Sequence, residues 1–183
     1  YKIKKNYPET LIGIANMYLF KKDYKNALEF YIKASKKDKN NTEALINASL
    51  CYKMLGITDK STEYANKVFE KDKVNAKTYY TASKIDEIKN IQYLKKAVSQ
   101  NPMFIDAWLD LADIAIKNNR ADLAKTYIKP VKYVDSKNYR YYYYSGLIKK
   151  QQGNKDAAAQ DFKKSLEINP FFVDASKELN SQL

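Results

Sequence analysis

Small and large apolar residues recur along this chain at a fixed interval. In each period a small residue marks the middle of a predicted helix, and a large residue precedes it by four positions, so both lie on one helical face. Successive small residues are separated by 34, 34, 29 and 34 positions. The small residues are Ala15, Ser49, Ser83, Ala112 and Gly146, and the large residues are Leu11, Leu45, Tyr79, Trp108 and Tyr142.

A second set of small residues marks a second helix in each period. Its members are separated by 34, 29, 34 and 34 positions, and they are Ala27, Ser61, Asn90, Ala124 and Ala158. A fixed period of this length is the mark of stacked helical hairpins, so we predict an all-α repeat fold. Both sets contain one short interval, which places a deletion of five residues between Ser83 and Asn90. We therefore expect a shorter hairpin around residues 85–89.

The period also predicts how the chain is divided. Residues 1–6 align with the tail of a second helix, so we expect the chain to begin inside an earlier unit. At the other end, Leu179 and Leu183 lie on one side of a predicted helix that would cap the array and keep it soluble. The predicted segments are the tail 1–7, the hairpins 8–41, 42–75, 76–104 (shortened), 105–138 and 139–172, and the capping helix 173–183.

Pro130 is the residue that conflicts most with this regular pattern. It falls inside the second helix of the fourth hairpin, where proline lacks the backbone N–H and its ring clashes with the preceding turn, at a cost of ~3 kcal/mol. We therefore expect the helix to kink or break near residues 126–129.

The residues at these positions resemble the tetratricopeptide repeat over nearly the whole chain. The first helix carries the family's large, large-small and aromatic series at Leu11, Ile14-Ala15 and Tyr18, and Pro102 and Pro170 occupy its closing proline. The second-helix series is Ala27, Tyr31 and Ala34, and again Ala158, Phe162 and Ser165. The resemblance implies a right-handed α-solenoid of about five hairpins plus a cap, whose first helices line a concave groove for a peptide.

The composition argues against an enzyme. The chain has no histidine and a single cysteine, Cys51, and it lacks the motifs of a serine nucleophile, a phosphate-binding loop or a metal cluster. We therefore predict no catalytic site, no cofactor and no metal site, and we place Cys51 in the core. No apolar run approaches the ~18 residues of a membrane span, and the compartment stays open.

The net charge of +12 raises the possibility of a polyanion partner. However, only Arg120 and Arg140 are arginine, and the lysines are spread along the chain. This distribution is typical of solvated helix faces and disfavours a nucleic-acid partner. Likewise, the run Tyr141 to Tyr144 spans all sides of a helix, which favours core and groove positions over a base-stacking platform.

The resemblance places a candidate peptide groove one turn away from the buried stripe. Many of its residues are apolar, and we expect them to be exposed together, as in a binding surface. Phe20 and Met54 belong to the wider set. The main candidates are Ile12, Asn16, Ile46, Asn47, Leu50, Lys77, Tyr80, Leu109, Tyr143 and Leu147.

Asn16, Asn47 and Lys77 coincide with three of the five positions that form a carboxylate clamp in chaperone-tail-binding members of the family. The family's other lysine and its arginine fall here on Ile12 and Thr81, so two cationic contacts are missing. Asparagine amides can still hold a peptide backbone through two hydrogen bonds. The resemblance thus implies a general backbone-binding site rather than a complete clamp.

Together these features predict a non-enzymatic scaffold that binds a peptide or partner protein, whose identity the sequence does not give. Two alternatives remain open. One is a basic helical-repeat protein that binds RNA or another polyanion, which would show a strong salt dependence. The other is a structural arm of a larger protein that associates with itself.

Overall fold

The computed structural model describes residues 7–71 and 74–181, and in this part of the chain every regular element is an α-helix. The helices form two compact halves, an N-terminal half that ends at Ala97 and a C-terminal half that begins at Val98. The predicted remnant of an earlier unit at residues 1–6 lies outside the described residues, as does Leu183.

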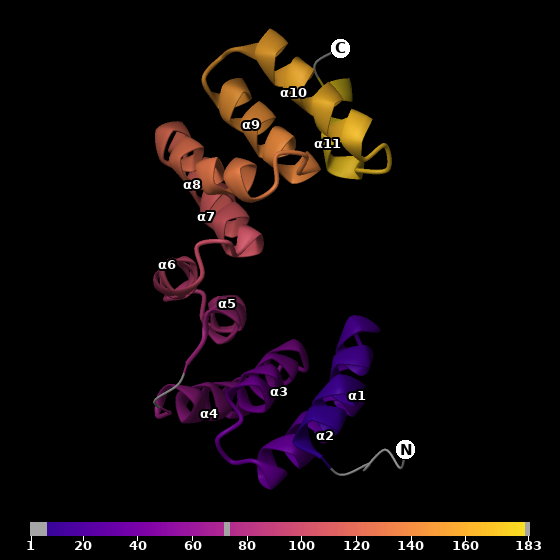
Figure 1. Cartoon of the computed structure of the whole chain (residues 1–183), viewed down its shortest axis with the longest axis vertical. Helices are drawn as coiled ribbons and strands as arrows, with labels where there is room; N and C mark the ends of the chain where they lie inside the picture. The colour runs from indigo at the N-terminus through magenta and orange to yellow at the C-terminus, as the bar shows by residue number, and fades with distance from the viewer. Residues whose placement is uncertain (1–6, 72–73, 182–183) are drawn as a thin grey trace. The chain divides into compact units, whose positions relative to one another are not determined.

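The N-terminal half consists of consecutive antiparallel hairpins (Figure 1). Helix α1 packs on α2, α2 on α3, and α3 on both α4 and α5. Ala15, Ala27 and Ala48 are fully buried in the first core, where their small side chains let the helices approach closely. The helices are α1 (Pro8–Phe20), α2 (Tyr24–Lys37), α3 (Thr42–Met54), α4 (Thr58–Phe69), α5 (Ala76–Ile85) and α6 (Asn90–Gln100), which runs into the second half.

The C-terminal half repeats this arrangement. Its core contains Ala112, Ala124 and Ile148, and Phe162 of the last hairpin is fully buried. Each helix packs on the next one, and α7 also packs on α9. The helices are α7 (Ile105–Lys117), α8 (Ala121–Val134), α9 (Tyr139–Gln151), α10 (Lys155–Ile168) and α11 (Val173–Asn180).

Polar residues set the helix starts, and a left-handed residue sets the turns. The side chains of Asp23 and Asn41 accept hydrogen bonds from backbone N–H groups three positions on, which satisfies donors that lack a partner in the helix. Within four hairpins, the chain turns through a residue with positive φ, a conformation that glycine adopts without strain. These residues are Lys22, Gly56, Asn119 and Gly153.

The third hairpin turns differently, because the deletion removes that position. Helix α5 has 10 residues, against 13 in each of the other first helices, and α6 has 11. This agrees with the shorter hairpin that the sequence predicts. Asp86 follows α5 and accepts hydrogen bonds from the backbone N–H groups of Ile88 and Lys89, both at 3.0 Å, which forms a compact polar turn.

The predicted break at Pro130 is absent. Helix α8 continues from Ala121 to Val134 with Pro130 inside it. Ile128 and Val131 are both buried on either side of the proline, so packing on the core holds the helix together although Thr126 loses the helical donor to its carbonyl. The expectation of a break underestimated this tertiary contribution.

Candidate functional site

The predicted groove residues of the N-terminal half lie on α1, α3 and α5, but they differ in exposure. Asn16 is exposed, and Leu50 and Tyr80 are half-buried. In contrast, Ile12, Ile46 and Asn47 are buried, with 7%, 1% and 6% of their surface exposed. The expectation that these three face solvent is therefore wrong.

Contact between neighbouring hairpins explains the burial of Ile46 and Asn47. Helix α3 packs on α2 and α4 and also on α5, so residues next to its main buried stripe are covered as well. Ile46 belongs to the same apolar cluster as Leu45 and Val68 of its own hairpin and Ala82 of the following hairpin. Ile46 is therefore part of the core between the hairpins.

The apolar residues that do face solvent lie one turn further along the same helices. Phe20 at the end of α1 and Met54 at the end of α3 are 91% and 50% exposed. They occupy corresponding positions, 34 residues apart, in consecutive hairpins. Met17 on α1 is 63% exposed, and no sequence argument singled it out because it lies outside the repeating groove positions.

Asn16 is held in place by the core. The hydroxyl of the buried Tyr31 on α2 donates a hydrogen bond to Asn16 Oδ1 at 2.5 Å. Burial raises the pKa of Tyr31 well above its usual value, so the hydroxyl stays a donor. The amide oxygen of Asn16 is thus occupied, and its NH₂ group has no hydrogen-bond acceptor among the described residues. The NH₂ group of the exposed Asn16 is therefore available as a donor.

Ile46, Asn47 and Lys77 do lie together, around a small cavity between α3 and α5. The cavity also touches Glu43 and Thr81, and its volume of about 20 Å³ suits a single water molecule. Lys77 Nζ lies 2.6 Å from Glu43 Oε1. A peptide carboxylate would have to compete with the Glu43 carboxylate for this lysine. Asn16 does not line this cavity.

The candidates of the C-terminal half are mostly covered. Leu109 on α7 is fully buried, so the expectation that it is an exposed groove residue is wrong; it fills the core instead. Tyr143 and Leu147 on α9 are half-buried. The Tyr143 ring meets Phe172 edge-on at 5.0 Å, and burial raises its pKa to about 12. Tyr143 therefore packs largely against its own hairpin.

The remaining chemistry of the described residues is limited. No group of three or more Cys, Asp or Glu side chains in residues 7–71 and 74–181 is placed to hold a metal ion. Across the same residues, every helix is too short or too polar to cross a membrane. Cys51 is fully buried, as predicted.

Comparison with known proteins shows which repeat family these hairpins resemble. The family model of the tetratricopeptide repeat matches residues 8–41 and 139–172. The TPR repeat-containing protein MJ1428 of Methanocaldococcus jannaschii is 30% identical over 168 residues, which cover 88% of this chain but 30% of that protein. The chain therefore spans under a third of the length of this relative.

Solved structures show the same fold. MamA is 27% identical with a TM-score of 0.67, covering 86% of this chain and 95% of that chain. PilW, a type IV pilus biogenesis factor, is 19% identical with a TM-score of 0.75, covering 94% and 86%. YrrB, described as a TPR protein with an unusual peptide-binding site, is 19% identical with a TM-score of 0.65, covering 98% and 94%.

These findings place the chain among the helical-repeat solenoids. More narrowly, two of its hairpins match the tetratricopeptide repeat, and its fold is that of the tetratricopeptide-repeat solenoids, as the residue pattern predicts. Proteins with this fold are generally scaffolds for protein interaction. The bounds of the hairpins within residues 42–138, between the two matched repeats, stay a prediction.

Proposed function

We propose that this protein is a non-catalytic scaffold that binds an extended or helical segment of a partner protein along the first helices of its N-terminal half. The observation that supports this most is the exposure of Phe20 and Met54 at corresponding positions of consecutive hairpins. Large apolar side chains left in water at corresponding positions of consecutive hairpins are typical of a surface that a partner covers.

The proposed surface contains both apolar and polar groups. Phe20, Met17 and Met54 provide adaptable apolar area, and methionine in particular fits varied partners. Asn16, oriented by Tyr31, donates its NH₂ group to a carbonyl of the bound segment. Leu50 and Tyr80 lie half-buried on α3 and α5 and extend the surface. The buried Ile12, Ile46 and Asn47 hold these helices in position.

In the C-terminal half, we propose a separate and smaller binding surface on α9. Leu147 and Tyr143 keep part of their surface exposed, while Leu109 supports α7 from the core. The solved relative whose description mentions a peptide-binding site, YrrB, has the same fold. That description supports a peptide as the class of ligand.

The test is quantitative affinity capture with the double variant Phe20→Ser, Met54→Ser. Wild-type protein and the variant are immobilised in equal amounts and exposed to lysate of the source cells, and bound proteins are quantified by mass spectrometry. The expected result is a loss of about tenfold or more in the specific partners, since two apolar anchors are removed. Tyr133→Ser, a 95% exposed position on α8, is the matched control and retains them. Unchanged recovery by the double variant would overturn the proposal.

A further inference from the structure

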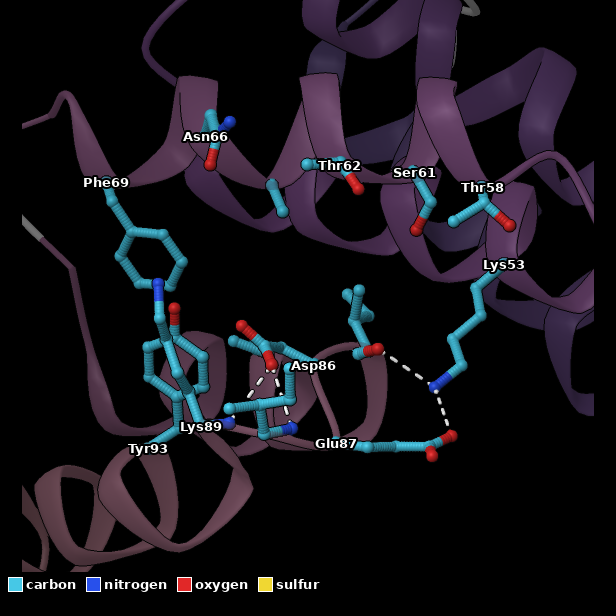
Figure 2. A pocket seen from close by; sticks show the side chains of 14 residues that line it. Lys53, Thr58, Ser61, Thr62, Asn66, Phe69, Asp86, Glu87, Lys89 and Tyr93 are labelled. Atoms are coloured by element: carbon cyan, nitrogen blue, oxygen red, sulfur yellow. Dashed lines mark hydrogen bonds and ion pairs between the residues drawn. The ribbon is translucent and has the colours of Figure 1, made fainter.

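The short third hairpin leaves a pocket beside α4. Its volume is about 550 Å³, within the range of binding sites for small ligands and peptide side chains. One wall is α4, and the opposite wall is the end of α5, the turn after it and the start of α6 (Figure 2). Lys53 lies at one end of the pocket, and Phe69, Tyr93 and Lys89 lie at the other.

The deletion explains why the pocket exists. The five missing residues would have lengthened the hairpin between Ser83 and Asn90, where the polar turn of Asp86 to Lys89 now forms the pocket wall. Five residues correspond to about one turn of helix. We therefore attribute the open space beside α4 to the deletion.

The wall formed by α4 differs from its counterpart in the preceding hairpin. Thr58, Thr62 and Asn66 on α4 are all polar and exposed. The residues 34 positions earlier, on α2, are all large, apolar and half-buried. They are Tyr24, Leu28 and Ile32. Tyr24 and Leu28 pack against the core that α3 helps to form. The same helix face is thus apolar where a full hairpin covers it and polar where the short hairpin leaves it open.

The polar groups on this wall are available to a ligand. The side chains of Thr58, Thr62 and Asn66 make no hydrogen bond within the described part of the chain. Ser61 is different, because its hydroxyl donates to the Ser49 carbonyl at 2.9 Å in the core. The three free side chains are four residues apart on a helix, about 6 Å from one to the next. Alternate residues of an extended peptide are about 6.7 Å apart, so each free side chain can meet every second peptide group.

The rest of the pocket adds an apolar floor and a lysine. Phe69 and Tyr93 stack at 5.1 Å, and Ile85 packs with them on the same cluster. Lys53 is already bonded to the carbonyls of Lys84 and Ile85 and to Glu87. Asp86 is bonded to its own turn. No carboxylate in residues 7–71 or 74–181 forms an ion pair with Lys89, so its ammonium group can attract an anion. The Asp86 carboxylate, which acts on the neighbouring Tyr93, opposes this attraction, so the anion must lie on the side of Lys89 away from Asp86.

We propose that this pocket is a second peptide-binding site, which takes an extended segment of four to five residues with an apolar side chain and a carboxylate. The backbone runs along Thr58, Thr62 and Asn66, the apolar side chain lies on Phe69 and Ile85, and the carboxylate pairs with Lys89. Ile88, 94% exposed on the turn, extends the apolar floor at the pocket mouth. The site does not use Phe20 or Met54, so it stands independently of the first-helix surface.

The experiment selects a displayed library of random heptapeptides on the whole chain and measures the enriched peptides by fluorescence anisotropy. The double variant Thr62→Leu, Asn66→Ile places the α2 residues on the α4 wall. Its expected affinity is about tenfold weaker, because two hydrogen bonds of ordinary strength are lost. Lys89→Glu is expected to weaken binding about tenfold or more, and a peptide whose acid is replaced by lysine should recover binding to that variant.

The controls separate this pocket from the first-helix surface and from a general effect of charge. Lys95→Glu makes the same charge change at an exposed position of α6 outside the pocket and should bind as wild type. Phe20→Ser should leave these peptides bound, even if it abolishes partner capture. Paired peptides with a free or an amidated carboxyl terminus distinguish a terminal carboxylate from an Asp or Glu side chain. If the double variant fails to fold, the exposed Lys89→Glu change decides alone.

The proposal is overturned if no peptide is enriched, or if enriched peptides respond equally to Lys89→Glu and Lys95→Glu. It is also overturned if binding is lost with Phe20→Ser and kept in the pocket variants, which would assign the peptides to the first-helix surface.

Discussion

Lys77 on α5 pairs with Glu43 on α3 at 2.6 Å, and the two residues occupy the same position in consecutive hairpins. Arg140 and Asp106 repeat the relationship in the C-terminal half, also at 2.6 Å and 34 residues apart. An ion pair thus joins successive first helices at this position in each half. Since both partners of the first pair are partly exposed, the pair stabilises the fold only slightly. Its main consequence is that the Glu43 carboxylate already occupies the Lys77 ammonium group.

This pairing makes a prediction about peptide termini. In wild-type protein, peptides with a free and an amidated carboxyl terminus should bind the first-helix surface about equally, because Glu43 repels a second carboxylate near Lys77. In Glu43→Gln, Lys77 is released, and the free terminus should gain several-fold in affinity at low salt. Isothermal titration with both peptide forms measures this. A wild-type preference of about tenfold or more for the free acid that disappears in Lys77→Ala would contradict it.

Replacing Pro130 should stabilise the protein. Pro130→Ala restores a backbone N–H in the middle of the continuous helix α8, and it removes the clash with the preceding turn. We expect a gain of about 1–3 kcal/mol in the free energy of unfolding, reduced in part because alanine loosens the unfolded chain. Urea denaturation followed by circular dichroism measures the gain. Pro170→Ala, in the turn before α11, serves as the control and should bring no such increase.

Two glycines in first helices should respond in opposite directions to alanine. A Cβ on Gly146 would lie 2.5 Å from Cε1 of the fully buried Phe162, so the ring or the helix must move. Overpacking of this kind costs about 1–3 kcal/mol, of which the better helix propensity of alanine recovers about 1 kcal/mol. A Cβ on Gly13 meets nothing within 4 Å.

Thermal denaturation therefore distinguishes the two sites. Gly13→Ala should raise the melting temperature, and Gly146→Ala should lower it. An increase in both variants would show that the Phe162 side chain adapts without cost and that the close approach is not required for packing α9 on α10.

The thiol of Cys51 should be inert in the folded protein. Burial raises its pKa from 9.0 to about 12, so the thiol stays protonated at about pH 8 and shielded from reagents. The raised pKa also means that any stabilisation from the neutral thiol is present below about pH 9 and is lost as the pH rises towards 12. Ellman's reagent at about pH 8 should react slowly with native protein and at once in denaturant. Fast reaction of native protein would show that the α1 to α3 core opens readily.

Much of the fold could be read from the residues alone. The spacing of Ala15, Ser49 and Ala112 and of their second-helix counterparts reflects a packing requirement that every hairpin shares, because close helices need small side chains on facing sides. The same register located the short hairpin, since a deletion shifts both sets together. Both features can be predicted without knowing which distant residues are in contact, because they depend only on spacing along the chain.

The groove was predicted less well, because exposure depends on two neighbouring hairpins at once. Ile12, Ile46 and Leu109 lie one turn from the buried stripe, and periodicity alone could not show that adjacent helices cover them. Phe20 and Met54 lie at helix ends, where the neighbouring hairpin no longer covers them.

The sequence by itself determined the repeat, its helices and the position of the deletion, because these depend on spacing along one chain. The tertiary structure decided which side chains are available. It joined Asn16 to Tyr31 and Lys77 to Glu43, it kept α8 continuous through Pro130, and it left Thr58, Thr62 and Asn66 uncovered beside the short hairpin. Each of these outcomes depends on the packing of residues far apart in the sequence, which no local pattern contains.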